Sequence, residues 1–201
     1  YVRLARDLDF ILATDECYCE IYCGAPPPGI IEACATDDGH LRNVIAFHSL
    51  SKRSNVPGLR SGFVVGDSDL IMDFARLRQY TGGASPGPIL AAATSLWKDE
   101  AHVKANRALY RDKFSDAEKI IGSHPHFYRP DGGFYLWLKV GDGEETARRL
   151  WASAGVKVMP GAYLSREGGN PPGAAYIRLA LVHDRSKTTE ALTRLATHIQ
   201  E

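Results

Sequence analysis

The sequence predicts an α/β protein in which a mostly parallel sheet is followed by a smaller α+β domain. In the first half, short apolar segments that suit buried strands alternate with segments whose apolar residues recur at helical spacing. Two of these expected strands run directly into polar residues, and the carboxyl ends of parallel strands are where α/β sheets bind ligands. We therefore expect a first domain over residues 1–100 and a second domain over residues 101–201.

The expected elements of the first domain are separated by clear breaks. Residues 1–8 have the pattern of an amphipathic helix, and the proline-rich segment 25–29 cannot be helical. Ser68 is the expected N-cap of a helix that ends near residue 80, and a further helix ends near residue 98. The expected strands are 9–14, 43–48 and 61–66.

The second domain is expected to begin with a long helix, Val103–Ile121. Its apolar stripe consists of Tyr110, Phe114, Ala117 and Ile121. Gly155 is expected to end the next helix, 144–153, and Asp184 to cap the last one. The apolar face of that last helix is Leu192, Leu195, Ala196 and Ile199. Strands are expected at 133–140, 156–159 and 175–182.

Composition argues against several classes of partner. The chain has 24 Lys and Arg and 24 Asp and Glu, so its formal net charge is zero and no basic excess indicates nucleic acid. No apolar run approaches the roughly 18 residues of a membrane helix. The four cysteines lack the paired spacing of a metal site, so we expect no metal, free thiols and a cytoplasmic location.

Lys52 follows the apolar segment Val44–His48 and is flanked by residues that suit a phosphate. Ser49 lies three residues before it and Arg60 eight residues after it. A lysine amine becomes a nucleophile only where its surroundings keep it from being a hydrated ammonium. This arrangement predicts an amine that condenses with an aldehyde cofactor. The alternative is a strand followed by a polar surface loop.

The segment Ser49–Gly62 resembles the lysine segment of class I/II aminotransferases, which have fold type I and depend on pyridoxal 5'-phosphate. The resemblance implies that Lys52 bonds to the cofactor aldehyde and is the catalytic residue. It also implies that Ser49 and Arg60 bind the cofactor phosphate. Amino acids and 2-oxo acids are then the expected substrates.

A second motif of that family, D-E-x-Y after a buried strand, matches Asp15–Tyr18. Asp15 precedes Lys52 by 37 residues. The resemblance implies that Asp15 pairs with the protonated pyridine nitrogen and that Tyr18 binds the phenolic oxygen. A carboxylate beside the ring nitrogen keeps the ring cationic, and a cationic ring withdraws electrons from the substrate. Taken alone, both residues would be ordinary strand-end residues.

Arg178 interrupts the apolar segment Ala174–Val182. A buried guanidinium is costly unless it is paired, and its fork suits a carboxylate. The family keeps an arginine in this late strand, so the resemblance implies that Arg178 binds the substrate α-carboxylate. The alternative is an edge-strand arginine that faces solvent.

The resemblance covers nearly all of the chain but only the second half of a complete family member, so we expect the C-terminal part of the large cofactor-binding domain over residues 1–100 and the small C-terminal domain over residues 101–201. The segments Ser51–Phe63, Trp97–Val103 and Asn106–Arg111 resemble a narrower group, the succinyldiaminopimelate aminotransferases of lysine biosynthesis. Other aminotransferases, carbon–sulfur lyases with the same cofactor and non-catalytic regulatory domains stay open as alternatives. The family also implies a homodimer.

Overall fold

The computed structural model describes residues 1–82, 84–166, 169 and 171–199. These divide into two compact units, Tyr1–Arg107 and Ala108–Glu201, and the division falls within helix α6 (Ala101–Ile121). The predicted domain division after residue 100 stays a prediction. Among the described residues, no helix has both the length and the apolar character needed to cross a membrane.

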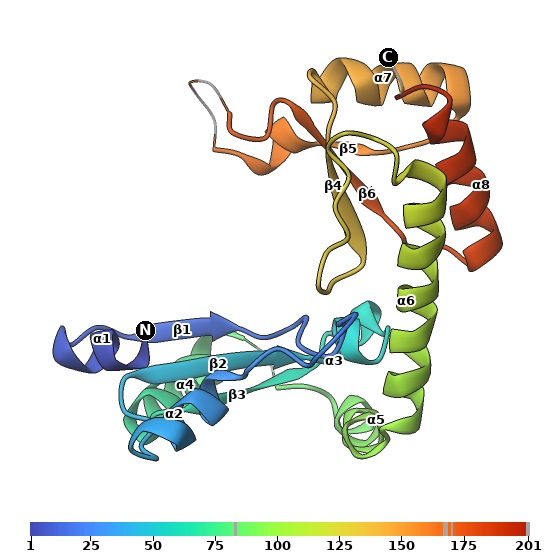
Figure 1. The fold of residues 1–201 in the computed structure, drawn as a ribbon. Coiled ribbons are helices and arrows are strands. Elements are labelled where there is room, and N and C mark those ends of the chain that lie inside the picture. The colour runs from blue at the N-terminus through green and yellow to red at the C-terminus, as the bar shows by residue number, and fades with distance from the viewer. Residues whose placement is uncertain (83, 167–168, 170, 200–201) are drawn as a thin grey trace. The chain divides into compact units, whose positions relative to one another are not determined.

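The first unit has a three-stranded sheet in the order β1-β2-β3 (Figure 1). Strands β1 and β2 are parallel, which agrees with the predicted α/β class, whereas β3 is antiparallel to β2. The link from β2 to β3 contains only two short helical turns, and a parallel neighbour would need a full crossover. In chain order the elements are α1 (Val2–Asp7), β1 (Leu12–Asp15), α2 (Ile30–Asp37), β2 (Val44–Ser49), α3 (Leu50–Arg53), the 3₁₀ turn η1 (Pro57–Leu59), β3 (Gly62–Gly66), α4 (Ser68–Thr81) and α5 (Gly87–Lys98).

Part of the core of this unit joins α1, α2 and β2. Val2, Cys34 and Val44 are buried against one another. Helix α2 was not predicted, because it is only eight residues long and directly follows a proline-rich segment. The predicted cap of α4 was wrong by one residue: Asp67, rather than Ser68, accepts the capping bond from the amide of Asp69.

The second unit has an antiparallel sheet in the order β4-β6-β5 (Figure 1). Helices α7 and α8 contact each other, and α7 also contacts β6. Besides the rest of α6, the elements are β4 (Tyr135–Lys139), α7 (Gly143–Ala154), β5 (Met159–Pro160), the 3₁₀ turn η2 (Gly161–Leu164), β6 (Tyr176–Ala180) and α8 (Arg185–Ala196).

The helix patterns of the second half are confirmed in this unit. Gly155 ends α7 in the left-handed conformation with φ 64°, and Asp184 caps α8 by accepting from the amide of Lys187. The four residues of the predicted α6 stripe are all buried, as are three of the four predicted on the last helix: Tyr110, Phe114, Ala117, Ile121, Leu192, Leu195 and Ile199.

Candidate active site

The parallel pairing of β1 and β2 brings two chemically important segments to the same edge of the sheet. Asp15 pairs with Phe47 in the register, and the amide of Glu16 donates to the carbonyl of Phe47 over 2.9 Å. Strand β1 therefore ends at Asp15 beside the point where β2 runs into Ser49 and α3. Residues that are far apart in the sequence become neighbours because parallel strands end at the same edge.

Lys52 lies on the short helix α3, whose N-cap residue is Ser49. The Ser49 Oγ atom accepts from the amide of Ser51 over 3.1 Å and so caps this helix. The Lys52 Nζ atom lies 5.5 Å from the centroid of the Tyr18 ring, within the range of a cation–π contact. The structure thus brings the predicted lysine and the predicted tyrosine together.

Asp15 and Cys17 are close enough to shift each other's pKa, and Lys52 is close enough to act on both. Hydrogen bonding from Cys17, first from its thiol and then from its amide, holds the pKa of Asp15 below 3.8, and the Lys52 ammonium acts in the same direction. Burial, followed by hydrogen bonding to Asp15 and its negative charge, raises the pKa of Cys17 to about 11, while Lys52 opposes the rise. Asp15 is therefore a carboxylate at neutral pH, which suits a partner with a positive charge.

A pocket of about 960 Å³ is lined by both predicted phosphate ligands together with Cys17, whereas Asp15, Tyr18 and Lys52 are not among its described lining residues. The Ser49 hydroxyl donates to Ser51 Oγ over 2.9 Å, so binding a phosphate oxygen would require its proton to turn. Arg60 adopts the left-handed conformation with φ 51°, and its Nη1 donates to the carbonyl of Pro57 over 2.9 Å. A non-glycine residue in this conformation is uncommon and often belongs to a functional site.

Arg178 lies in the second unit. It is the central residue of β6, where it pairs with Trp137 of β4 and Met159 of β5. Its guanidinium lies 5.4 Å from the centroid of the Tyr135 ring, and the side chain is half-buried. The alternative of an edge strand is therefore wrong, because β6 has a neighbour on both sides.

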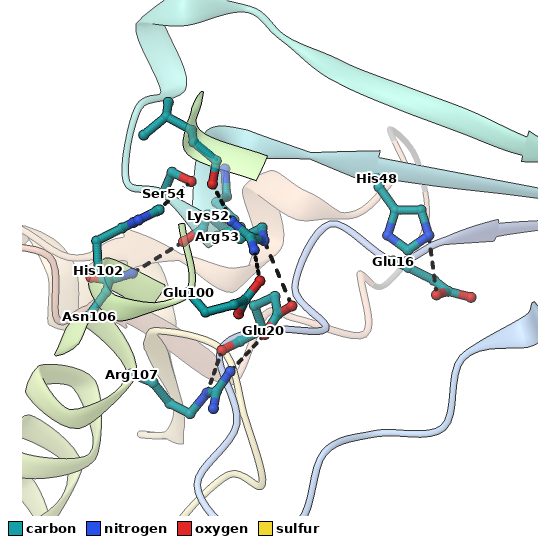
Figure 2. A network of polar contacts seen from close by, with 11 residues as sticks. Glu16, Glu20, His48, Lys52, Arg53, Ser54, Glu100, His102, Asn106 and Arg107 are labelled. Carbon is teal, nitrogen blue, oxygen red and sulfur yellow. Dashed lines mark hydrogen bonds and ion pairs between the residues drawn. The ribbon is translucent and has the colours of Figure 1, made fainter. Parts of the chain in front are cut away.

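A polar network around Lys52 was not predicted (Figure 2). Arg53 is only 5% exposed, and it donates to the carbonyl of Leu96 over 2.8 Å and to the carboxylate of Glu100. The Nδ2 atom of Asn106 donates to the carbonyl of Lys52 over 3.3 Å, so two further segments contact this turn.

His102 and Arg107 extend this network along α6. The ring of His102 bridges Asp99 and the Ser54 hydroxyl at 2.8 and 2.9 Å. Arg107 pairs with Glu20 over 2.7 Å. These partners are separated by 43 to 87 residues in most cases, so no local pattern could have revealed them. The only hint of this network in the sequence was Arg53, a charged residue directly after Lys52.

The cysteines and acidic residues do not form a metal centre in the part of the chain that the structure describes. No group of three or more His, Cys, Asp or Glu side chains there could hold an ion. The four cysteines are free thiols: Cys17, Cys19, Cys23 and Cys34.

The sequence of the chain matches one protein family over almost its whole length. The model of the class I and II aminotransferases matches residues 2–195. The chain belongs to the class I and II aminotransferases. This family consists of transferases with pyridoxal phosphate as the cofactor, so the predicted family, fold type and cofactor are confirmed.

Individual aminotransferases resemble this chain over almost its whole length. A crystal structure of an aminotransferase from Neisseria meningitidis is 41% identical with a TM-score of 0.91, and the alignment covers 99% of this chain and 52% of that one. A probable aminotransferase of Mycobacterium tuberculosis is 30% identical, with 96% of this chain and 45% of that protein covered. The LL-diaminopimelate aminotransferase of Aquifex aeolicus is 32% identical, with 96% and 49% covered. The chain therefore spans about half the length of the curated relatives that it matches.

The side chains at the edge of the first sheet fit the chemistry of pyridoxal phosphate. Lys52 offers an amine for the aldehyde, Asp15 a carboxylate for the ring nitrogen and Tyr18 a hydroxyl for the phenolic oxygen. Ser49 and Arg60 offer a hydroxyl and a guanidinium for the phosphate, and they line one pocket. The donor set therefore matches the cofactor of the family.

Proposed function

We propose that this chain is the second half of an enzyme that transfers an amino group from L-glutamate to N-succinyl-2-amino-6-oxopimelate. The products are 2-oxoglutarate and N-succinyl-diaminopimelate, and the reaction is reversible. The observation that carries the proposal is the convergence of Lys52 with Tyr18 and Asp15 at one edge of the sheet. A cytoplasmic location and a homodimer belong to the same proposal and rest on the family resemblance.

Two observations support the choice of substrate. The relative from Aquifex aeolicus is named as an aminotransferase of LL-diaminopimelate, the same carbon skeleton without the succinyl group. In addition, the segments Ser51–Phe63, Trp97–Val103 and Asn106–Arg111 resemble the succinyldiaminopimelate enzymes. The cofactor chemistry is common to the whole family, so the substrate is the more specific part of the proposal.

Lys52 is proposed to move the proton that amino transfer requires. When bound, pyridoxal phosphate supplies an aldehyde that condenses with amines and a ring that withdraws electrons. The Lys52 amine, once neutral, takes the proton from the substrate α-carbon as a general base. Its half-buried position on α3 limits its contact with water.

Asp15 and Tyr18 are proposed to hold the ring, and Ser49 and Arg60 the phosphate. Asp15 has a depressed pKa and keeps its negative charge, so it can stabilise a proton on the ring nitrogen. The Tyr18 hydroxyl can donate to the phenolic oxygen. The two phosphate ligands retain the cofactor while its aldehyde end reacts, and such positioning contributes to the rate.

Arg178 is proposed to bind the α-carboxylate of both amino-acid partners. Its central place in β6 restrains the backbone on both sides, and its contact with the Tyr135 ring orients the guanidinium. A planar guanidinium can bind a carboxylate through two parallel hydrogen bonds.

The proposal is tested by trapping the covalent adduct in the full-length protein. The protein is mixed with pyridoxal phosphate, reduced with borohydride and digested, and the modified lysine is identified by mass spectrometry. We expect one adduct per chain at Lys52, which Lys52→Ala should abolish and the exposed-site control Lys187→Ala should retain. Labelling spread over several surface lysines would contradict the assignment of Lys52.

The substrate is tested separately with the same protein. Glutamate-dependent amino transfer to N-succinyl-2-amino-6-oxopimelate should exceed transfer to pyruvate or oxaloacetate in kcat/KM, and Lys52→Ala should lower it by at least about a thousandfold. An intact adduct at Lys52 together with a preference for another oxo acid would retain the mechanism and overturn the substrate.

A further inference from the structure

Glu20 joins two segments of the first unit that carry the proposed active-site residues (Figure 2). Its Oε2 atom lies 2.7 Å from Arg107 Nη2, and its Oε1 atom lies 3.8 Å from Arg53 Nε. Arg107 Nε also donates to the backbone carbonyl of Glu20 over 2.9 Å. A single carboxylate is thus held between two guanidinium groups, one of which also holds its backbone.

Both arginines are themselves held firmly in place. Arg53 is only 5% exposed, and its guanidinium lies 5.0 Å from the centroid of the Trp97 ring. Arg107 is 14% exposed and stacks 3.9 Å from the centroid of the Tyr22 ring. Planar guanidinium groups held by rings and carbonyls lose little further freedom when they bind a carboxylate. Glu20 therefore has fixed partners.

The two ends of this connection lie next to the proposed active-site residues. Glu20 is two residues after Tyr18, and Arg53 directly follows Lys52. Near Asp15 the sheet itself holds the chain, since the amide of Glu16 donates to β2. Beyond that point the segment leaves the sheet and continues through turn bonds from Cys19 to Glu16 and from Ile21 to Tyr18. Glu20 ties this departing segment back to α3, and the buried side chain of Ile21 anchors the same stretch.

We propose that Glu20 is a positioning residue that fixes Tyr18 relative to the Lys52 amine. This inference rests on the proposed function, in which both side chains act on the same small ring. Two groups from different segments can do so only if the distance between them is constant, and a displacement of about 1 Å can cost about a hundredfold in rate. The carboxylate itself touches neither substrate nor cofactor in this scheme.

Glu20→Gln in the full-length protein is the direct test, because it keeps the volume and removes the charge. We expect the rate of Lys52 trapping by pyridoxal phosphate and borohydride to fall at least tenfold. The pH at the midpoint of the absorbance change of the bound cofactor should also shift, because the Tyr18 hydroxyl would no longer be held near the cofactor ring. kcat should fall more than KM rises, since substrate binding is assigned to Arg178.

Glu100→Gln is the matched control. It also removes a carboxylate from Arg53, but Glu100 directly precedes α6 and has no contact with the Tyr18 segment among the described hydrogen bonds and ion pairs. We expect it to change trapping by less than twofold. Arg107→Met should reproduce the effect of Glu20→Gln, and the double variant should be no worse than either single one, as residues acting through one contact are not additive.

Circular dichroism and thermal unfolding show whether each variant is folded, and Glu20→Asp provides a rescue for a variant that is not. The inference is overturned if folded Glu20→Gln traps Lys52 at the natural rate with an unshifted pH midpoint, or if Glu100→Gln has an equal effect. Failure of the natural sequence to trap Lys52 at all would instead refute the proposed function.

Discussion

The Nζ atom of Lys52 lies 5.5 Å from the centroid of the Tyr18 ring, although the two residues are 34 positions apart in the sequence. The parallel pairing of β1 and β2 produces this proximity, because each residue follows the carboxyl end of one of these strands. Asp15 and Cys17 lie in the same region, and the mutual effects of their charges can be measured without any cofactor.

Alkylation of Cys17 tests this electrostatic arrangement. A thiol with a pKa of about 11 is a thiolate to only about one part in a thousand at about pH 8, so Cys17 should react slowly with iodoacetamide. Asp15→Asn should react faster than the natural protein, because the carboxylate raises the pKa of Cys17. Lys52→Met should react more slowly than the natural protein, because Lys52 lowers that pKa. Alkylation rates measured by mass spectrometry on the cofactor-free protein show whether each variant reacts faster or more slowly than the natural protein. Equal rates in the two variants would show that these groups are not neighbours.

Asp15→Asn should leave the cofactor bound but slow amino transfer by about a hundredfold or more, because the ring nitrogen loses its anionic partner. The phosphate ligands Ser49 and Arg60 are unchanged, so the dissociation constant of the cofactor should rise far less than the rate falls. Equilibrium dialysis and initial rates separate the two effects. Normal turnover would remove Asp15 from the proposed mechanism.

The pH dependence of the natural protein follows from the depressed pKa of Asp15. Its carboxylate stays charged until the pH falls below 3.8, the ordinary value for the group. We therefore expect no loss of amino transfer from protonation of Asp15 as the pH is lowered from neutral to about 5. Kinetics over that interval, with stability followed in parallel, check this expectation. A loss that disappears in Asp15→Asn would assign the titration to this residue and contradict the low pKa.

Arg178→Lys should raise KM for the amino-acid substrates by about tenfold or more, because an ammonium cannot form the two parallel hydrogen bonds of a guanidinium. The effect on kcat should be smaller. Arg194→Lys, an exposed arginine of α8 paired with Glu190, is the matched control and should change neither constant. Steady-state kinetics with varied glutamate give the comparison, and an unchanged KM in Arg178→Lys would exclude it from carboxylate binding.

We expect Lys113 to contribute to the second unit a stability that increases as the pH rises toward 10.5. It is only 7% exposed and its Nζ donates to the carbonyl of Leu181 over 2.9 Å, and burial lowers its pKa from 10.5, partly offset by Asp184. Between the lowered pKa and 10.5 the folded state binds fewer protons than the unfolded state, so the free energy of unfolding should rise with pH.

Lys113→Met should remove this increase, whereas Lys119→Met, at an exposed position of the same helix, should retain it. Urea unfolding at a series of pH values up to about 10.5, followed by circular dichroism, measures the difference between each variant and the natural protein. A pH-independent difference for Lys113→Met would mean that this lysine has the same pKa in both states.

Local patterns in the sequence determined much of the secondary structure. They also identified the residues whose side chains could take part in catalysis or bind a ligand. Apolar periodicity located α6 and α8, and Gly155 and Asp184 marked helix ends because they act through their own backbone or nearest amides. The motifs around Lys52 and Asp15 identified the family, since they contain the reactive groups in a fixed order along the chain.

Only the tertiary structure decided which distant residues support those groups. The antiparallel direction of β3, the central place of Arg178 in its sheet, and the contacts of Glu20 with Arg53 and Arg107 all depend on segments that are far apart in the sequence. The spacing of apolar residues indicates which face of a helix or strand is buried. It does not indicate which other helix or strand packs against that face. An ion pair across 87 residues exists only because packing brings its two side chains together.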